Sequence, residues 1–192
     1  MKKVYTCFCT DIIHAGHKNL LRAAAELGRV TVGVLSDAEM VRYNRFPTKT
    51  LEERMAMLSE LPEVAEVIVQ DHIMYDEVLD RLRPDYVVHG SNWAQGPESS
   101  IRKNVLAALA RYGGQLVEPP YTYNEEVRKI DWQMREQLAM PEARRGRLRR
   151  LLAIVPIVKT IEVHNGLTGL IAEKTVVEND GGLDQFEAMW VS

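Results

Sequence analysis

Cysteine is scarce in this sequence of 192 residues. Cys7 and Cys9 are the only two, too few for the disulfide framework of a small secreted domain. If both lie on one strand, their side chains share a face, and we expect two buried thiols in a reducing compartment. A zinc site would need two further ligands nearby, and the sequence offers none there.

Export and membrane signals are also lacking. No stretch approaches the roughly 18 apolar residues of a membrane span. Met1, Lys2 and Lys3 precede a short mixed segment, where a signal peptide would carry its apolar core. The formal charge is -3 and the isoelectric point about 6.0, whereas nucleic-acid-binding domains are usually basic. We therefore expect a cytoplasmic protein with no membrane and no nucleic-acid partner.

Positive charge is dense in one stretch, from Arg144 to Arg150, where five of seven residues are arginine. A charge run of this kind is usually a solvated helix face. Contacts with phosphate or with another subunit are the alternatives.

Apolar segments of strand length alternate along the chain with segments of helical periodicity. Gly28 ends one helical segment, and Thr50 with Glu53 forms a capping box at the start of another. We expect strands over residues 3–9, 30–35, 67–70, 85–89 and 115–118. We expect helices over residues 17–27, 50–61, 75–82 and 101–112.

Near-continuous apolar strands that alternate with helices predict an α/β fold, a Rossmann-like doubly wound parallel sheet covered on both faces. Ligands of such sheets bind beyond the carboxyl ends of the strands. The polar motifs of this sequence fall at those ends or at the start of the following helix. We therefore expect the functional site there.

The character of the sequence changes after Tyr121. We expect a first domain over residues 1–124, a charged helical extension over 125–153 and a tail over 154–192, with strands near 157–163 and 186–191. The tail holds too little apolar material to fold alone.

Two histidines carry the functional prediction. His14 lies at the end of the first loop and His17 at the start of the first helix, with Gly16 between them. Backbone N–H groups and the positive dipole end of a helix favour phosphate, and the glycine lets phosphate approach the backbone closely. Nucleotidyl transfer needs such donors, because negative charge builds on the phosphate oxygens in its transition state.

The segment from Asp11 to His17, DIIHAGH, resembles the HxGH signature of the cytidylyltransferase-like nucleotidyltransferases. The resemblance covers about residues 3–122, and it continues through Asp37, 43–47, 52–54, 86–93 and Arg102. It implies that His14 and His17 contact the triphosphate of CTP, with Mg²⁺ as cofactor, and that Asp11 orders the loop or assists the metal.

The resemblance also assigns further residues. Arg45 and Arg54 correspond to basic residues of the phosphate site, and Lys129 is expected still to reach it. Arg45 and Lys129 join the two histidines as catalytic candidates. The candidates for nucleotide binding are Phe8, Cys9, Thr10, Asp11, Gly16, Arg54, His89, Gly90, Asn92, Trp93 and Arg102.

The sequence departs from the family at the second phosphate-binding helix. Where a Gly-Ile-Ser-Ser-Thr-Lys type of segment is usual, this chain reads YTYNEEVRK from Tyr121 to Lys129. Carboxylates at a helix start disfavour phosphate. This departure motivates an alternative, a catalytically weak nucleotide-binding or docking domain.

The tail narrows the choice of acceptor. The stretch from Glu162 to Ile171 resembles the first strand and helix of phosphoenolpyruvate mutase, a (β/α)8 barrel, and 186–192 resembles its second strand. The resemblance implies a cytidylyltransferase covalently fused to a mutase domain of phosphonate biosynthesis of the fosfomycin type, with 2-hydroxyethylphosphonate as acceptor. A phosphonate is already an anion at neutral pH and needs no general base.

A phosphonate acceptor needs cations, and Lys18, Arg42 and Arg45 are the candidates, together with Lys129. The 125–152 helices could also pack across a homodimer. An adenylyltransferase with another small phosphorylated acceptor is the second alternative.

Overall fold

The computed structural model describes residues 1–43, 45–94, 98–120, 125, 129–130, 132, 141–179 and 182–192. The chain divides into two compact units. Unit 1 comprises residues 1–36 and 48–123, and unit 2 comprises residues 37–47 and 124–192.

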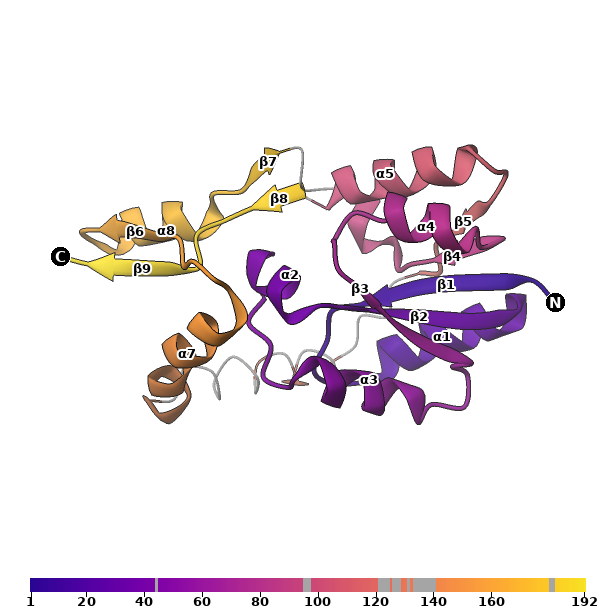
Figure 1. The fold of residues 1–192 in the computed structure, drawn as a ribbon, viewed down its shortest axis with the longest axis horizontal. Coiled ribbons are helices and arrows are strands. Elements are labelled where there is room, and N and C mark those ends of the chain that lie inside the picture. The colour runs from indigo at the N-terminus through magenta and orange to yellow at the C-terminus, as the bar shows by residue number, and fades with distance from the viewer. Residues whose placement is uncertain are drawn as a thin grey trace. The chain divides into compact units, whose positions relative to one another are not determined.

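Unit 1 is built on a parallel sheet of five strands in the order β3-β2-β1-β4-β5 (Figure 1). The strands are β1 (Lys3–Phe8), β2 (Arg29–Leu35), β3 (Glu66–Gln70), β4 (Tyr86–Val88) and β5 (Gln115–Val117). Each neighbouring pair is parallel and in regular register, with Val4 opposite Val30 on one side and Tyr86 on the other. The predicted α/β fold with a parallel sheet is therefore confirmed.

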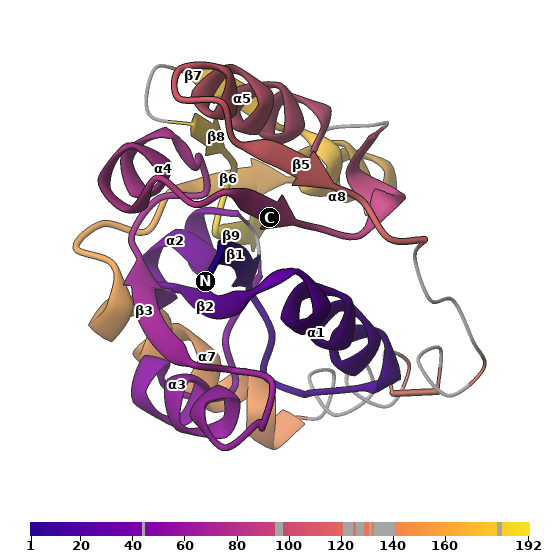
Figure 2. The same ribbon diagram turned by 90° about the vertical axis from the view of Figure 1, so that its right-hand side faces the viewer.

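Helices cover both faces of this sheet. Figure 2 shows α1 and α3 on one face and α4 and α5 on the other. Their bounds are α1 (Ala15–Leu27), α3 (Leu51–Ser59), α4 (Asp76–Leu82) and α5 (Ser99–Ala110), and η1 (Ser91–Ala94) is a short 3-10 turn after β4. The chain winds outward from β1 to β3 and then returns to the other side of β1, so that the strand order reverses between β1 and β4. In sheets of this kind, ligands bind beyond the strand ends at that switch point.

The alternation of side chains along the strands explains the two cores. Val30, Val32 and Val34 of β2 face Leu21 of α1 and Leu58 of α3, and all five side chains are fully or almost fully buried.

On the other face, Gly33 leaves room for the ring of Tyr5. A Cβ at position 33 would lie only 1.9 Å from Tyr5 Oη, so the aromatic ring requires glycine there. The Tyr5 hydroxyl donates to Gln70 Oε1 at 2.5 Å, which satisfies its buried polar atom.

Unit 2 contains the helices α2 (Asp37–Arg42), α7 (Pro141–Ile154) and α8 (Gly166–Lys174) and the strands β6 (Thr160–Val163), β7 (Val177–Asn179), β8 (Gly182–Asp184) and β9 (Ala188–Val191). Strands β6 and β9 pair in parallel, and β7 and β8 form an antiparallel hairpin. The connection between the parallel strands β6 and β9 therefore contains α8 and also β7 and β8.

Most predicted elements in the first 120 residues agree with the structure to within two or three residues at each end. Helix α2 was not predicted. It has only six residues, and three of them, Glu39, Met40 and Val41, are buried, so its sequence shows no full turn of amphipathic spacing. Strand β6 begins at Thr160, later than predicted. No helix in the described part of the chain is long and apolar enough to cross a membrane.

Candidate active site

His14 caps helix α1 with its imidazole ring. Its Nδ1 accepts a hydrogen bond from the Gly16 N–H at 3.1 Å, and its side chain also accepts from the His17 backbone. The His17 Nδ1 accepts in return from the His14 N–H at 3.4 Å. The two histidines thus form a reciprocal capping box. The first N–H groups of α1, expected to face phosphate, are instead bonded to His14.

These bonds fix which nitrogen carries the proton in each neutral ring. A nitrogen that accepts from a backbone N–H holds a lone pair, so the hydrogen must sit on Nε2 in both His14 and His17. Both histidines therefore present an Nε2–H donor. The donors lost from the helix backbone are replaced by donors on the two rings.

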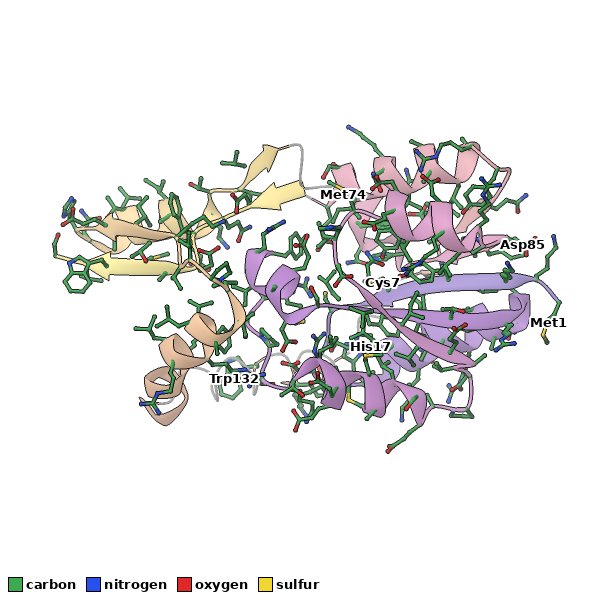
Figure 3. All side chains as sticks on the ribbon, in the orientation of Figure 1. Met1, Cys7, His17, Met74, Asp85 and Trp132 are labelled. Atoms are coloured by element: carbon green, nitrogen blue, oxygen red, sulfur yellow. The ribbon has the colours of Figure 1, made fainter. Side chains whose placement is uncertain are left out.

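The rings are held close together. The His14 and His17 centroids lie 3.9 Å apart with a tilt of 34°, and Phe8 at the end of β1 packs edge-on against His17 at 4.9 Å. Figure 3 labels His17 near the start of α1 and Cys7 on β1. Two Nε2–H donors at this spacing are suited to a single phosphoryl group.

Asp11 was predicted as a metal ligand, but its carboxylate is buried and bonded to other residues of the protein. Its carboxylate is buried, and Oδ2 accepts from the Thr48 N–H at 2.6 Å and from the Thr48 hydroxyl at 2.7 Å. Oδ1 lies 3.9 Å from Nε of Arg54, whose side chain is completely buried. Arg54 therefore offers no accessible surface to a phosphate in this structure. Together with Thr48, the pair ties the β1–α1 loop to the start of α3.

The switch point has two edges: the residues after β1 form the first, and the residues after β4 form the second. The rings of His89 and Trp93 are stacked, 3.6 Å apart and inclined by only 12°. His89 Nδ1 lies 2.8 Å from the Gly90 carbonyl oxygen. A carbonyl oxygen only accepts, so Nδ1 carries the proton, and Nε2 is left as an acceptor in the neutral ring. In the neutral rings, Nε2 of His89 is thus an acceptor, whereas Nε2 of His14 and of His17 is a donor.

Glu118, just beyond β5, organises this edge. Its Oε1 accepts from Trp93 Nε1 at 2.6 Å and from Arg102 Nε at 2.9 Å, and its Oε2 accepts from Arg102 Nη2 at 2.7 Å. Arg102, as hydrogen-bond donor, lowers the pKa of Glu118, and Trp93 lowers it further. Glu118 in turn raises the pKa of Arg102.

Sequence reasoning predicted Trp93 and Arg102 as nucleotide-binding residues and missed Glu118. The signal was weak, because a lone carboxylate between a strand and two prolines matches no motif. Only the fold brings Arg102 of α5 and Trp93 of η1 onto it.

The other predicted residues of unit 1 surround these two edges. Thr10 closes a tight turn, donating to the Ile12 carbonyl at 2.7 Å, and Cys9 is half-buried beside it. Lys18 and Asn92 are exposed. Burial raises the pKa of the Cys7 thiol, which disfavours the reactive thiolate.

Three predicted cations lie in unit 2. Arg42 and Arg45 are exposed, and Arg42 Nη1 lies 3.4 Å from the Glu39 carboxylate. Lys129 is exposed. Their roles at the site stay predictions, and the segment 121–128 falls almost wholly outside the described residues.

The described residues give no ready metal centre. Nowhere in the described ranges do three or more His, Cys, Asp or Glu side chains come together as a metal site would need. The carboxylate of Asp11 is already engaged by Thr48 and Arg54.

The model of the cytidylyltransferase-like family matches residues 5–141 of the chain. Among curated proteins, an ethanolamine-phosphate cytidylyltransferase from Arabidopsis thaliana is 33% identical over 116 residues, which is 57% of this chain and 28% of that protein. The bifunctional protein HldE of Hahella chejuensis is 38% identical over 134 residues, 68% of this chain and 25% of that protein. The HldE of Pseudomonas aeruginosa strain PAO1 is 34% identical over 118 residues, 60% of this chain and 24% of that protein.

The chain thus spans only about a quarter of the length of the curated relatives it matches. A solved structure also resembles it, the lipopolysaccharide core biosynthesis protein of Thermoplasma volcanium. The TM-score is 0.54 at 20% identity, and the match covers 65% of this chain and 99% of that one. At that identity the likeness supports the fold alone.

Proposed function

The chain belongs to the cytidylyltransferase-like family, and on that premise we propose that it transfers CMP from CTP to a small phosphonate, with release of pyrophosphate. The observation that carries the proposal is the pair of Nε2–H donors on His14 and His17 beside the switch point of the sheet. Donors fixed in advance stabilise charge that develops in the transition state, and they need no reorganisation during the reaction.

In the proposed step, a phosphonate oxygen attacks the α-phosphorus of CTP and forms a phosphonate–phosphate anhydride. The bond from that phosphorus to the bridging oxygen breaks, and the electron pair leaves with pyrophosphate. The two histidines donate hydrogen bonds to the phosphate oxygens that gain charge. Mg²⁺ bound to the triphosphate would offset the negative charge of its phosphate oxygens.

At the second edge, His89 and Arg102 bind the nucleoside. Trp93 is buried behind His89 and stacks on its ring, and Glu118 holds Trp93 and Arg102 in position. The stacked pair of His89 and Trp93 offers an acceptor at His89 Nε2. A site that hydrogen-bonds its ligand discriminates strongly against analogues without the matching group.

The phosphonate is the finer part of the proposal. It is supported by the resemblance of the tail to phosphoenolpyruvate mutase and by the parallel pairing of β6 with β9. The connection between these strands contains α8, as in a (β/α)8 barrel, with β7 and β8 added to it. The name of the Arabidopsis relative favours a second acceptor class, a phosphate monoester such as ethanolamine phosphate.

One assay decides between these acceptors. The protein is incubated with Mg²⁺, each of CTP and ATP, and either 2-hydroxyethylphosphonate or ethanolamine phosphate, and the products are followed by phosphorus NMR. We expect a mixed anhydride signal with CTP and the phosphonate. A product with ethanolamine phosphate alone would replace the acceptor and leave the cytidylyltransferase. Turnover with ATP only would refute the proposal, and nucleotide binding without turnover with any pair would identify a docking domain.

A further inference from the structure

Tyr75, at the start of helix α4, is held at both of its ends. Its backbone N–H donates to Asn104 Oδ1 at 2.8 Å, and the Asp76 N–H donates to the same oxygen at 3.1 Å. The Tyr75 side chain makes no capping bond itself, so α4 receives its cap from Asn104 of α5. At the other end, the Tyr75 hydroxyl is hydrogen-bonded to the side chain of Cys7 on β1. Tyr75 is therefore fixed between the sheet and α5.

The ring of Tyr75 packs edge-on against two other aromatic rings. Its centroid lies 6.0 Å from that of Tyr5, with the ring planes 82° apart, and 6.1 Å from that of Trp93, with the planes 61° apart. Aromatic pairs at this spacing are stabilised beyond the area that they bury. Tyr5 is itself buried and hydrogen-bonded to Gln70. Tyr75 thus presents a fixed edge to Trp93.

Trp93 depends on such neighbours for its position. It belongs to η1, a 3-10 turn of only four residues, and turns of this kind hold their side chains less firmly than a long helix does. Its side chain is 1% exposed and stacks on the ring of His89. A shift of the indole ring would therefore move the His89 imidazole with it.

Helix α5 supports Trp93 by two routes. Arg102 donates to Glu118, which accepts from Trp93 Nε1, and Asn104 holds the backbone of Tyr75, whose ring packs on Trp93. Arg102 and Asn104 are two residues apart, so their side chains do not face each other on the helix. Each route reaches Trp93 through a different neighbour.

We propose that Tyr75 is a positioning residue of the second edge, which fixes the place of Trp93 and, through the stacked rings, that of the His89 imidazole. Tyr75 is only 4% exposed and acts through Trp93 without touching a substrate. Groups that are fixed in advance bind a ligand more tightly, because less freedom is lost on binding. That this edge takes the nucleoside of CTP rests on the proposed function, whereas the fixing of Trp93 rests on contacts within unit 1.

The role of Tyr75 is tested first by binding. Calorimetric titration with CTP and Mg²⁺, without an acceptor, is run on the parent protein and on its variants. Tyr75→Leu removes the edge-on contact, and we expect the Kd for CTP to rise by about threefold to tenfold. Tyr75→Phe keeps the ring and should stay within about twofold of the parent.

Tyr112→Leu is the matched control. It makes the same substitution at a half-buried tyrosine that follows the far end of α5, away from Asn104 and Arg102. Its Kd for CTP should stay within about twofold of the parent. In steady-state kinetics, Tyr75→Leu should raise the KM for CTP and leave the KM for the acceptor unchanged, a split that a general loss of stability does not produce.

Trp93 reports its own position without any ligand. Replacing the exposed Trp132 and Trp190 by phenylalanine leaves Trp93 as the only tryptophan. Its emission should resist quenching by acrylamide because the ring is buried. In this background, Tyr75→Leu should increase the quenching and shift the emission to the red, whereas Tyr112→Leu should do neither.

A Tyr75→Leu protein that binds CTP within about twofold of the parent would overturn the proposal, as would equal weakening by Tyr112→Leu or a parent that does not bind CTP. If Tyr75→Leu fails to fold, Asn104→Ala decides, because it releases the Tyr75 N–H and leaves the ring in place. An unchanged Kd and unchanged Trp93 emission in Asn104→Ala would then refute the role of Tyr75. A parent that binds CTP without turnover would sink the proposed function alone, and the binding series would still decide the role of Tyr75.

Discussion

The two edges of the switch point use histidine in opposite ways. After β1, His14 and His17 accept from backbone N–H groups and become donors at Nε2. After β4, His89 bonds a carbonyl oxygen and becomes an acceptor at Nε2. The side chain is the same, and the backbone partner at Nδ1 decides its role. Donors suit the oxygens of a triphosphate, and an acceptor suits an amino group of a base.

A carboxylate–arginine pair supports each edge, and the pairs differ in burial. The side chains of Asp11 and Arg54 are 4% and 0% exposed, whereas those of Glu118 and Arg102 are 22% and 32% exposed. Breaking a buried pair leaves an uncompensated charge inside the protein, while solvent screens a partly exposed one. The first edge should therefore depend on its pair for stability, and the second mainly for geometry.

The donor role of the first edge is tested by His17→Ala. We expect kcat/KM to fall by about 100-fold or more, as for loss of one preorganised donor. The fold should stay intact with a small fall in melting temperature, because the His14 N–H loses its acceptor. His72→Ala is the control, since His72 is an exposed histidine outside both edges. Activity within threefold of the parent would remove His17 from the mechanism.

The buried pair is tested by Asp11→Ala. The free energy of unfolding should fall by about 3 kcal/mol, because Arg54 is left buried without this carboxylate and Thr48 loses two hydrogen bonds. Urea unfolding measures the effect. Lys2→Ala is the comparison: its pair with Asp85 is surface-exposed, and its loss should lower the free energy of unfolding far less. If both variants lost the same free energy of unfolding, burial would not be what makes the Asp11–Arg54 pair important.

At the second edge, Glu118→Gln keeps the shape of the side chain and removes its charge. We expect the KM for CTP to rise by about tenfold, as for weakened charge-assisted hydrogen bonds, with a smaller change in kcat and a shift in tryptophan fluorescence from Trp93. A fall in kcat at constant KM would place Glu118 in the chemical step instead.

The smallest expected effect is a dependence on pH. The pKa of Glu118 is lowered in the folded protein, chiefly by Arg102. Its contribution to stability is therefore complete above the unfolded value of about 4.3, and it is lost as pH falls through the lower folded value. The stability difference between the parent and Glu118→Gln should then be constant near neutrality and vanish in acid. A difference that does not decline as pH falls below about 4.3 would contradict this.

The sequence predicted the sheet well, because β2 is a continuous apolar strand and Gly28 and the Thr50 capping box mark helix ends. It also placed His14 and His17 correctly at the first helix. It gave no sign that Arg54 would be buried or that His14 would use the helix N–H groups, since both depend on where α3 and the loop settle. The bonds of Glu118 and the packing of Tyr75 on Trp93 are contacts between segments far apart in the chain, and local patterns carry no record of them.

Residues 37–47 are a segment whose two ends are held in place. Although they interrupt unit 1 in sequence, they belong to unit 2 in space. Their flanks are tied down inside unit 1: the Ser36 N–H donates to the Gln70 carbonyl, and Thr48 donates to Asp11. A segment whose two ends are held by the fold can be replaced by another without disturbing that fold. Its length and charge can drift through evolution, or be swapped between relatives by an engineer, while the sheet and its histidines keep their shape.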